Sequence, residues 1–217
     1  RKYFAKLYLG SDLQWVGWAL SDSVSFLFST GVKQLQFNCT DGIGMLQSIP
    51  LQVPASTDIN VMQSMIYYFK TILNSLTFPS NPNILTACNY FASGMTDRST
   101  SSSADPFAQS YLPSRTFINA DYTYTDGLTV LTNIVKSFGC RVFMANGKWN
   151  IVQINQFAYD SDYYTEYDYT GTVTASGQFN SSSIIQGYTG NTSNVYFING
   201  TQTKLLRKGY NKINLQQ

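Results

Sequence analysis

The sequence predicts a β-rich α+β fold, and three observations support this class. Aromatic residues make up 15% of the 217 residues and charged residues only 12%, a balance typical of sheets whose surface carries hydroxyls and amides. Short runs of alternating apolar and polar residues occupy the first 40 positions, which is the period of a half-buried strand. Residues 125–154 combine a helical apolar stripe with a tight-turn signal. We therefore expect strands with a few inserted helices.

Residues 1–50 are expected to form a first β-region that ends in a short helix. Tyr3, Ala5 and Leu7 alternate with polar partners, and residues 34–40 repeat this pattern. Asp41 and Gly42 then provide turn and cap signals for a short helical piece before Pro50.

Residues 51–155 are expected to form an α/β insertion. Its strongest helix is predicted over residues 58–76, capped at Thr57 or Asp58 and ended by the prolines that follow. A Ser-rich loop is predicted over residues 93–114. This helix and this loop lie between the first β-region and residues 125–154, which carry the clearest local signals.

Residues 125–154 are predicted to form a helix followed by a β-hairpin. Thr125 or Asp126, which precede Gly127, can cap the helix, and Gly139 occupies the expected left-handed position after its last turn. Asn146 and Gly147 are the preferred pair for a tight hairpin turn, because both positions require positive φ.

The remaining residues, 156–217, are expected to begin a second β-region that continues beyond residue 217. Within it, the acidic side chains Asp160, Asp162, Glu166 and Asp168 alternate with tyrosines. Such a cluster could bind calcium through oxygen ligands or line a sugar site. A solvated loop is the favoured interpretation, because the spacing matches no EF-hand.

Little else in the composition indicates catalysis or a cofactor. The chain has no histidine, which removes the commonest general base. Its three cysteines lack metal-ligand spacing, and its net charge of +2 does not indicate specific nucleic-acid binding. We therefore expect no enzyme, no resident metal and no cofactor.

Five aromatic residues are predicted to be core or interface residues, because rings inside β-prone runs are usually packed. For the tryptophans, the alternative is that their rings stack on sugars. For Asp41 and Asp126, the alternative is a role as catalytic carboxylates, although helix capping accounts for both. The five aromatic residues are Trp15, Trp18, Trp149, Phe138 and Phe143.

The order of segments over residues 12–155 resembles the tail hub and tail-tip (baseplate hub-like) proteins of tailed bacteriophages. A Trp15–Trp18 strand precedes TDGIGMLQSIPL (40–51), then IYYFKTILNSL (66–76), then TDGLTVLTNIVKSFGCRVFMANGKWNIVQ (125–153). Members of this family carry an ATDGLGLLKDI-type segment and later an LEDILKAFGARLFQSNGKWYIV-type segment. The chain departs from the pattern at Gly44-Met45 and in its own Ser-rich loop.

This resemblance implies tail-tube-like β-barrel or β-sandwich regions with inserted helices. It implies a structural virion protein, assembled in the host cytoplasm, that closes the distal end of the tail tube as a homo-oligomer. A trimer is favoured, with a hexamer as the alternative. Expected partners are tube, distal adaptor, spike or fibre proteins, with DNA passing transiently.

Two other functions remain open from the sequence. The first is a carbohydrate-binding adhesin that contacts a host-surface glycan through the tyrosines of 157–170. The second is a polysaccharide-degrading tail enzyme that uses the acidic cluster, in which Asp160→Asn or Glu166→Gln would abolish turnover.

Overall fold

The computed structural model describes residues 3–20, 25–26, 35–36, 38–154 and 163–179. The chain divides into two units, residues 1–179 and 180–217, and all described residues belong to the first. Their fold is α+β and β-rich, which confirms the predicted class. The described strands form open sheets and no closed barrel.

A five-stranded mixed sheet is the centre of the fold, with the order β12-β11-β7-β10-β9. Its strands are β7 (Ile84–Ala87), β9 (Cys140–Ala145), β10 (Lys148–Gln153), β11 (Tyr163–Tyr167) and β12 (Val173–Gln178). The pair β7–β10 is parallel and the other pairs are antiparallel. All four residues of β7 are buried, as expected for a central strand. Strands β11 and β12 lie in the segment that was expected to begin a second β-region, and they join this sheet. The solvated loop favoured for the acidic cluster is wrong at Glu166, which lies on β11 and is buried.

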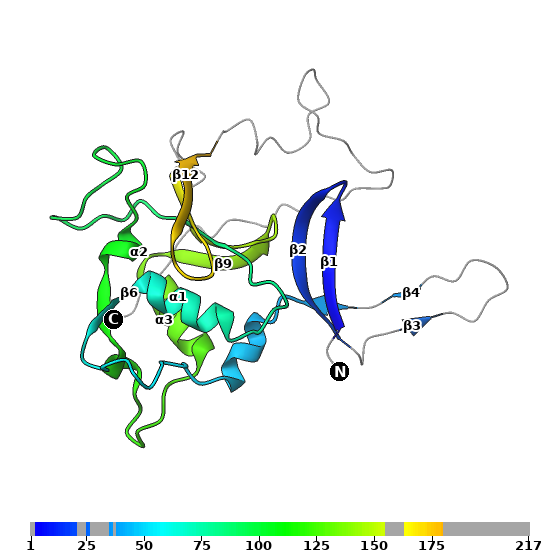
Figure 1. The fold of residues 1–217 in the computed structure, drawn as a ribbon, viewed down its shortest axis with the longest axis horizontal. Coiled ribbons are helices and arrows are strands. Elements are labelled where there is room, and N and C mark those ends of the chain that lie inside the picture. Colours follow the sequence, from blue (N-terminus) through cyan, green and yellow to red (C-terminus); the bar gives the residue numbers. More distant parts are fainter. Residues whose placement is uncertain (1–2, 21–24, 27–34, 37, 155–162, 180–217) are drawn as a thin grey trace, which may run out of the picture. The chain divides into compact units, whose positions relative to one another are not determined.

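Two helices, α1 (Met65–Asn74) and α3 (Gly127–Ser137), contact each other and the sheet to form the main core. Figure 1 shows them side by side. Tyr68, Phe69 and Ile72 of α1 are fully buried, as are Trp149 and Ile151 of β10. A methyl group on Gly127 would lie 3.2 Å from a carbon of Ile72. The small residue therefore permits the close approach of the two helices.

The first helix begins at Met65, later than the predicted start at residue 58. Residues 62–64 form β6 (Met62–Ser64), which pairs with β8 (Tyr111–Pro113). Ser64 caps α1 by accepting from the Tyr67 N–H at 3.3 Å. Asp58 instead accepts from the Asn60 N–H at 2.9 Å and closes a local turn. Pairing with a distant strand thus overrides the local helix signal.

The predicted Ser-rich loop also contains regular structure in its second half. It includes the helical turn α2 (Pro106–Gln109) and β8, and it is followed by the 3-10 helix η3 (Ser114–Phe117). Asp105 caps α2, and Phe107 is completely buried against Phe69 and Phe138. The Asp-Pro pair was a usable helix-start signal in the sequence.

A three-stranded sheet, with the order β1-β2-β5, also packs against the main core. Its strands are β1 (Tyr3–Leu9), β2 (Asp12–Ala19) and β5 (Cys39–Thr40). Three rings pack together here. Trp18 and Phe78 are stacked, with 5.5 Å between their ring centroids, and Phe4 packs edge-on against both. The short strands β3 (Ser25–Phe26) and β4 (Leu35–Gln36) pair separately.

The short helix expected before Pro50 is a 3-10 helix, η2 (Ile43–Ser48). Gly42 precedes it at φ 86°, and the Asp41 carboxylate accepts from the Ile43 N–H at 3.0 Å. Both residues therefore serve the local turn.

The helix and hairpin of residues 126–153 form with the predicted caps and turn. The Asp126 carboxylate accepts from the Thr129 N–H at 2.8 Å. Gly139 has φ +61°, and Asn146 and Gly147 have φ 51° and 67°. These values are those of a left-handed cap and of a type I′ turn, respectively.

Candidate functional site

The two described members of the predicted acidic cluster do not converge on one site. Glu166 is 7% exposed; it forms an ion pair with Lys148 at 2.6 Å and accepts from the Asn83 amide at 2.7 Å. Asp168 lies in the turn after β11, where Oδ1 accepts from the N–H groups of Thr170 and Thr172. Asp160 and Asp162 lie outside the described residues. Within the described part of the chain, no group of three acidic or thiol side chains could hold a metal ion.

A polar cleft of about 280 Å³ opens beside the Glu166–Lys148 pair. It lies where the β9–β10 turn meets the β1–β2 hairpin, and the Gly147 N–H donates to the Gln14 carbonyl at 3.2 Å. Carboxamides and amines contribute to the lining of the cleft, and so do the apolar side chains of Leu13 and Val16. Its polar lining residues are Lys6, Ser80, Asn81, Asn83, Asn146 and Lys148. Such a lining suits a hydroxyl-rich or weakly anionic ligand.

A buried polar network joins the sheet to α2, and no pattern in the sequence predicts it. Asp105 is 2% exposed and accepts from the Thr86 hydroxyl at 2.6 Å and the Tyr167 hydroxyl at 2.7 Å. Its second oxygen accepts from the Phe107 N–H at 2.9 Å. Burial raises the pKa of Asp105, and burial together with this carboxyl raises the pKa of Tyr167.

Arg98 extends this network into the Ser-rich loop. Its guanidinium donates to the Ser102 carbonyl at 3.0 Å and the Thr165 hydroxyl at 3.3 Å. Burial lowers its pKa, and the charge of Asp105 opposes that shift. Every polar atom of the Asp105 carboxyl is occupied by the protein itself. The network therefore fixes the loop on the sheet.

The five predicted core aromatics divide into buried and half-buried positions. Trp18 and Trp149 are 8% and 1% exposed, so neither presents a face to a ligand. Phe138 and Phe143 are half-buried, and so is Trp15. Trp15 is therefore the least buried of the three tryptophans, and it still packs against the main core.

The outer face of the β1–β2 hairpin exposes apolar side chains. Tyr3 and Leu7 are each 60% exposed, and Leu7 lies directly opposite Trp15 in the register. The Trp15 ring lies over Gly17, where any side chain would clash with it. Among the described residues, β1 pairs only with β2, so its outer edge is unpaired there. An apolar face beside an open strand edge is a recurrent site of protein association.

An apolar groove of about 250 Å³ lies between η2, α3 and β9. Most of its lining is aliphatic, and Lys136 also contributes to it. The other lining residues are Ile43, Leu128, Leu131, Thr132, Val135, Cys140 and Val142. The predicted cap Asp126 and the glycines Gly127 and Gly139 serve helix α3 beside this groove.

The three cysteines are free thiols, with Cys39 exposed and Cys88 and Cys140 buried. A hydrogen bond between the two buried thiols lowers the pKa of Cys88 and raises that of Cys140. These two thiols lie beside the Asp105 network and serve the core.

Comparison with known proteins adds no family to this description, since no family model, curated protein or solved structure matches the chain. Among the described residues, every helix is too short or too polar to cross a membrane.

Proposed function

We propose that this chain is a structural component of a bacteriophage tail, a hub or tip protein that oligomerises at the distal end of the tail tube. It docks spike, fibre or receptor-binding proteins and lines the exit path of the genome. In the virion its β-regions belong to tail-tube-like barrels or sandwiches that neighbouring copies complete. It carries no catalytic activity.

One observation carries this proposal, the apolar outer face of the β1–β2 hairpin. Tyr3 and Leu7 leave most of their surface exposed beside a strand edge that is unpaired among the described residues. A protein that works alone would expose such a face at a cost in solubility. A subunit of an assembly buries it against a neighbour.

The resemblance of residues 12–155 to tail hub proteins supports the same proposal. Its most specific segment, residues 125–153, folds as the helix and hairpin that its pattern predicts. The low content of charged residues fits a path for DNA, because strongly basic walls would retain the polyanion.

Light scattering and negative-stain microscopy of the full-length protein test this proposal. We expect a ring with an opening near the width of a tail tube. Leu7→Glu places a charge on the apolar face and should shift the protein to smaller species. Ser93→Glu, at an exposed position of the Ser-rich loop, is the control and should leave the ring intact. A monomer at every concentration, with no ring in assembled particles, would contradict the proposal.

The polar cleft favours a second candidate, a carbohydrate-binding module of a tail tip. Three asparagines and two lysines at its lining can hydrogen-bond sugar hydroxyls. A glycan array with the wild-type chain and with Asn81→Leu tests this function. Binding that is lost in the variant would favour the adhesin, whereas an array without signal would remove it.

A further inference from the structure

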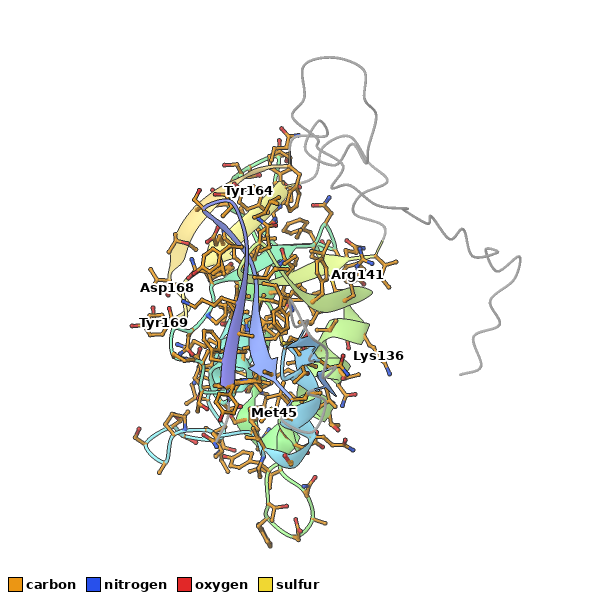
Figure 2. The ribbon with its side chains drawn as sticks, turned by 90° about the vertical axis from the view of Figure 1, so that its right-hand side faces the viewer. Met45, Lys136, Arg141, Tyr164, Asp168 and Tyr169 are labelled. Atoms are coloured by element: carbon orange, nitrogen blue, oxygen red, sulfur yellow. The ribbon has the colours of Figure 1, made fainter. Side chains whose placement is uncertain are left out.

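The polar cleft beside the Glu166–Lys148 pair is lined by three segments that are distant in the sequence. Strands β1 and β2 contribute Lys6 and Val16, which lie directly opposite each other in the register. Residues 80–83 and the β9–β10 turn contribute most of the remaining lining. Figure 2 shows the β1–β2 hairpin, in blue, in front of the five-stranded sheet. The cleft therefore forms only when the hairpin packs against this part of the fold.

Backbone hydrogen bonds hold these segments together. The Gly147 N–H donates to the Gln14 carbonyl at 3.2 Å and joins the β9–β10 turn to β2. The Trp149 N–H donates to the Asn83 carbonyl at 2.9 Å and joins residues 80–83 to β10. Because the protein itself orders the walls of the cleft, a ligand would bind without a large entropic cost for ordering them.

One positive charge in the cleft lacks a counter-charge. Lys148 pairs with one oxygen of Glu166, and the Asn83 amide donates to the other oxygen at 2.7 Å. Both carboxylate oxygens are therefore occupied, and the charges of Lys148 and Glu166 offset each other. No carboxylate among the described residues lies within ion-pair distance of Lys6. A ligand with a single negative charge would complement this arrangement.

The uncharged polar groups of the lining are mainly carboxamides. Asn81, Asn83 and Asn146 each carry donors and an acceptor, so they can pair with hydroxyls in either direction. The Asn81 Oδ1 atom is buried and has no hydrogen-bond partner in the described part of the chain. A turn of this amide about its last torsion would exchange its oxygen and nitrogen. A bound hydroxyl could then supply the partner that Oδ1 lacks, which favours a ligand rich in hydroxyls.

The size and the other lining residues narrow the class of ligand further. A volume of about 280 Å³ is near the lower end for ligand pockets, so the cleft suits a single ring. Its lining residues include no arginine and no helix N-terminus, which are groups that commonly bind phosphate. Leu13 and Val16 add apolar surface that can pack against the C–H groups of a sugar ring.

We propose that the cleft binds one hexuronic acid residue of a polysaccharide, a sugar ring that carries a carboxylate. Lys6 binds the carboxylate, the carboxamides bind the ring hydroxyls, and Leu13 and Val16 pack against the ring. The inference rests on the second candidate function, the carbohydrate-binding module, and specifies the class of sugar. It does not depend on the number of subunits in the assembly.

An NMR titration of the isotope-labelled whole chain with three probes tests this proposal. Methyl glucuronoside carries the carboxylate, methyl glucoside carries a hydroxymethyl group in its place, and inorganic phosphate is a small anion without a ring. Methyl glucuronoside should bind about tenfold more tightly than methyl glucoside, because a charged partner strengthens a hydrogen bond. The amide shifts should be centred on lining residues such as Gly147 and Lys148.

Two lysine variants form a matched pair. Lys6→Met removes the charge at an exposed position and keeps a side chain of similar length. It should weaken the binding of methyl glucuronoside about tenfold. Binding of methyl glucoside should be unchanged, which also shows that the cleft of the variant is folded. The control is Lys136→Met on α3, where Figure 2 shows the side chain projecting outward. Lys136 lines the apolar groove and not the cleft, so this variant should bind both sugars as the wild type does.

The results separate the class of sugar from the function. Equal affinities for the two sugars would overturn the selection of a carboxylate and leave the carbohydrate-binding function standing. Phosphate that binds more tightly than methyl glucuronoside would overturn the sugar as the ligand, and so would shifts centred away from the cleft. Binding of neither sugar would overturn this inference together with the second candidate function. The tail-hub proposal would still be decided by light scattering.

Discussion

The helix and hairpin of residues 126–153 and the Asp105 network depend on different parts of the sequence. The helix–hairpin unit uses signals from within 28 consecutive positions: a cap at Asp126, a stop at Gly139 and a turn at Asn146-Gly147. The network joins Asp105 to Thr86 in one direction and to Tyr167 in the other. The helix–hairpin unit can be predicted from the sequence, whereas the Asp105 network forms only after distant strands have paired.

This difference shows where the fold is held together. Local signals specify the unit, but its largest side chain, Trp149, is buried against elements outside it, including Phe78. The network buries little apolar surface. It instead holds the Ser-rich loop against the sheet, because each group that donates to Asp105 would be left without an acceptor if the loop moved away.

The largest expected effect is the removal of the Trp149 ring. Trp149→Ala should lower the free energy of unfolding by about 3–5 kcal/mol, because a 1% exposed ring leaves a cavity. Urea denaturation followed by circular dichroism measures it. The control is Phe143→Ala, which removes a half-buried ring on the neighbouring strand. It should lower the free energy of unfolding clearly less than Trp149→Ala does. Equal losses would mean that the unit does not depend on its contact with the rest of the core.

Removing the carboxyl at the centre of the network should have the next largest effect. Asp105→Ala leaves the hydroxyls of Thr86 and Tyr167 and the Phe107 N–H without their acceptor, at a cost of about 1–3 kcal/mol. The same denaturation experiment measures this cost. Asp105→Asn keeps an oxygen for the Phe107 N–H and should lose less. An alanine variant as stable as the wild type would show that the network does not hold the loop.

The cap of α3 should contribute less. Asp126→Ala removes the acceptor of the Thr129 N–H and should cost about 1 kcal/mol. Asp126→Asn keeps an oxygen acceptor and should cost only part of this. Thermal melting of the three proteins ranks them, and a loss as large as that of Trp149→Ala would contradict the view that α3 is held mainly by its buried face.

The final prediction concerns the sign of a pH dependence. Burial raises the pKa of Asp105 above its ordinary value of 3.8, so its contribution to stability is present below that value and is lost as the pH rises through the raised pKa. Burial alone would raise the pKa of Asp126 too, but hydrogen bonds from the first turn outweigh it and lower the pKa. The contribution of Asp126 is therefore present above 3.8 and is lost as the pH falls.

Denaturation from about pH 3 to pH 7 tests this contrast in Asp105→Asn and Asp126→Asn. The stability of the wild type relative to Asp105→Asn should decrease as the pH rises. Relative to Asp126→Asn, it should increase. Two curves with the same slope would contradict the assignment of the two carboxyls.

The sequence allowed the class of the fold and the helix–hairpin unit to be predicted, because their signals are local. It misplaced the start of α1, since β6 forms only when residues 111–113 pair with it. It also grouped Glu166 with Asp168, although neighbouring polar positions on a strand and its turn face different partners. Asp105 was missed because nothing near it in the chain reveals Thr86 or Tyr167.

The exposed surfaces were beyond prediction for a related reason. The outer face of the β1–β2 hairpin has the same alternating pattern as a strand that covers a core, and periodicity alone does not say which face is covered. The position of Leu7 opposite Trp15 on the outside became evident only from the register.

The parallel pairing of β7 with β10 has a consequence for biosynthesis. Strand β7 lies between β10 and β11, yet both neighbours follow it late in the chain, since Ile84 pairs with Trp149 and with Tyr167. A nascent chain therefore carries a strand that is fully buried in the folded protein long before its partners leave the ribosome. Such a strand is open to wrong pairing during that interval. We expect yield to depend on translation speed and chaperone supply more than on the stability of the finished fold.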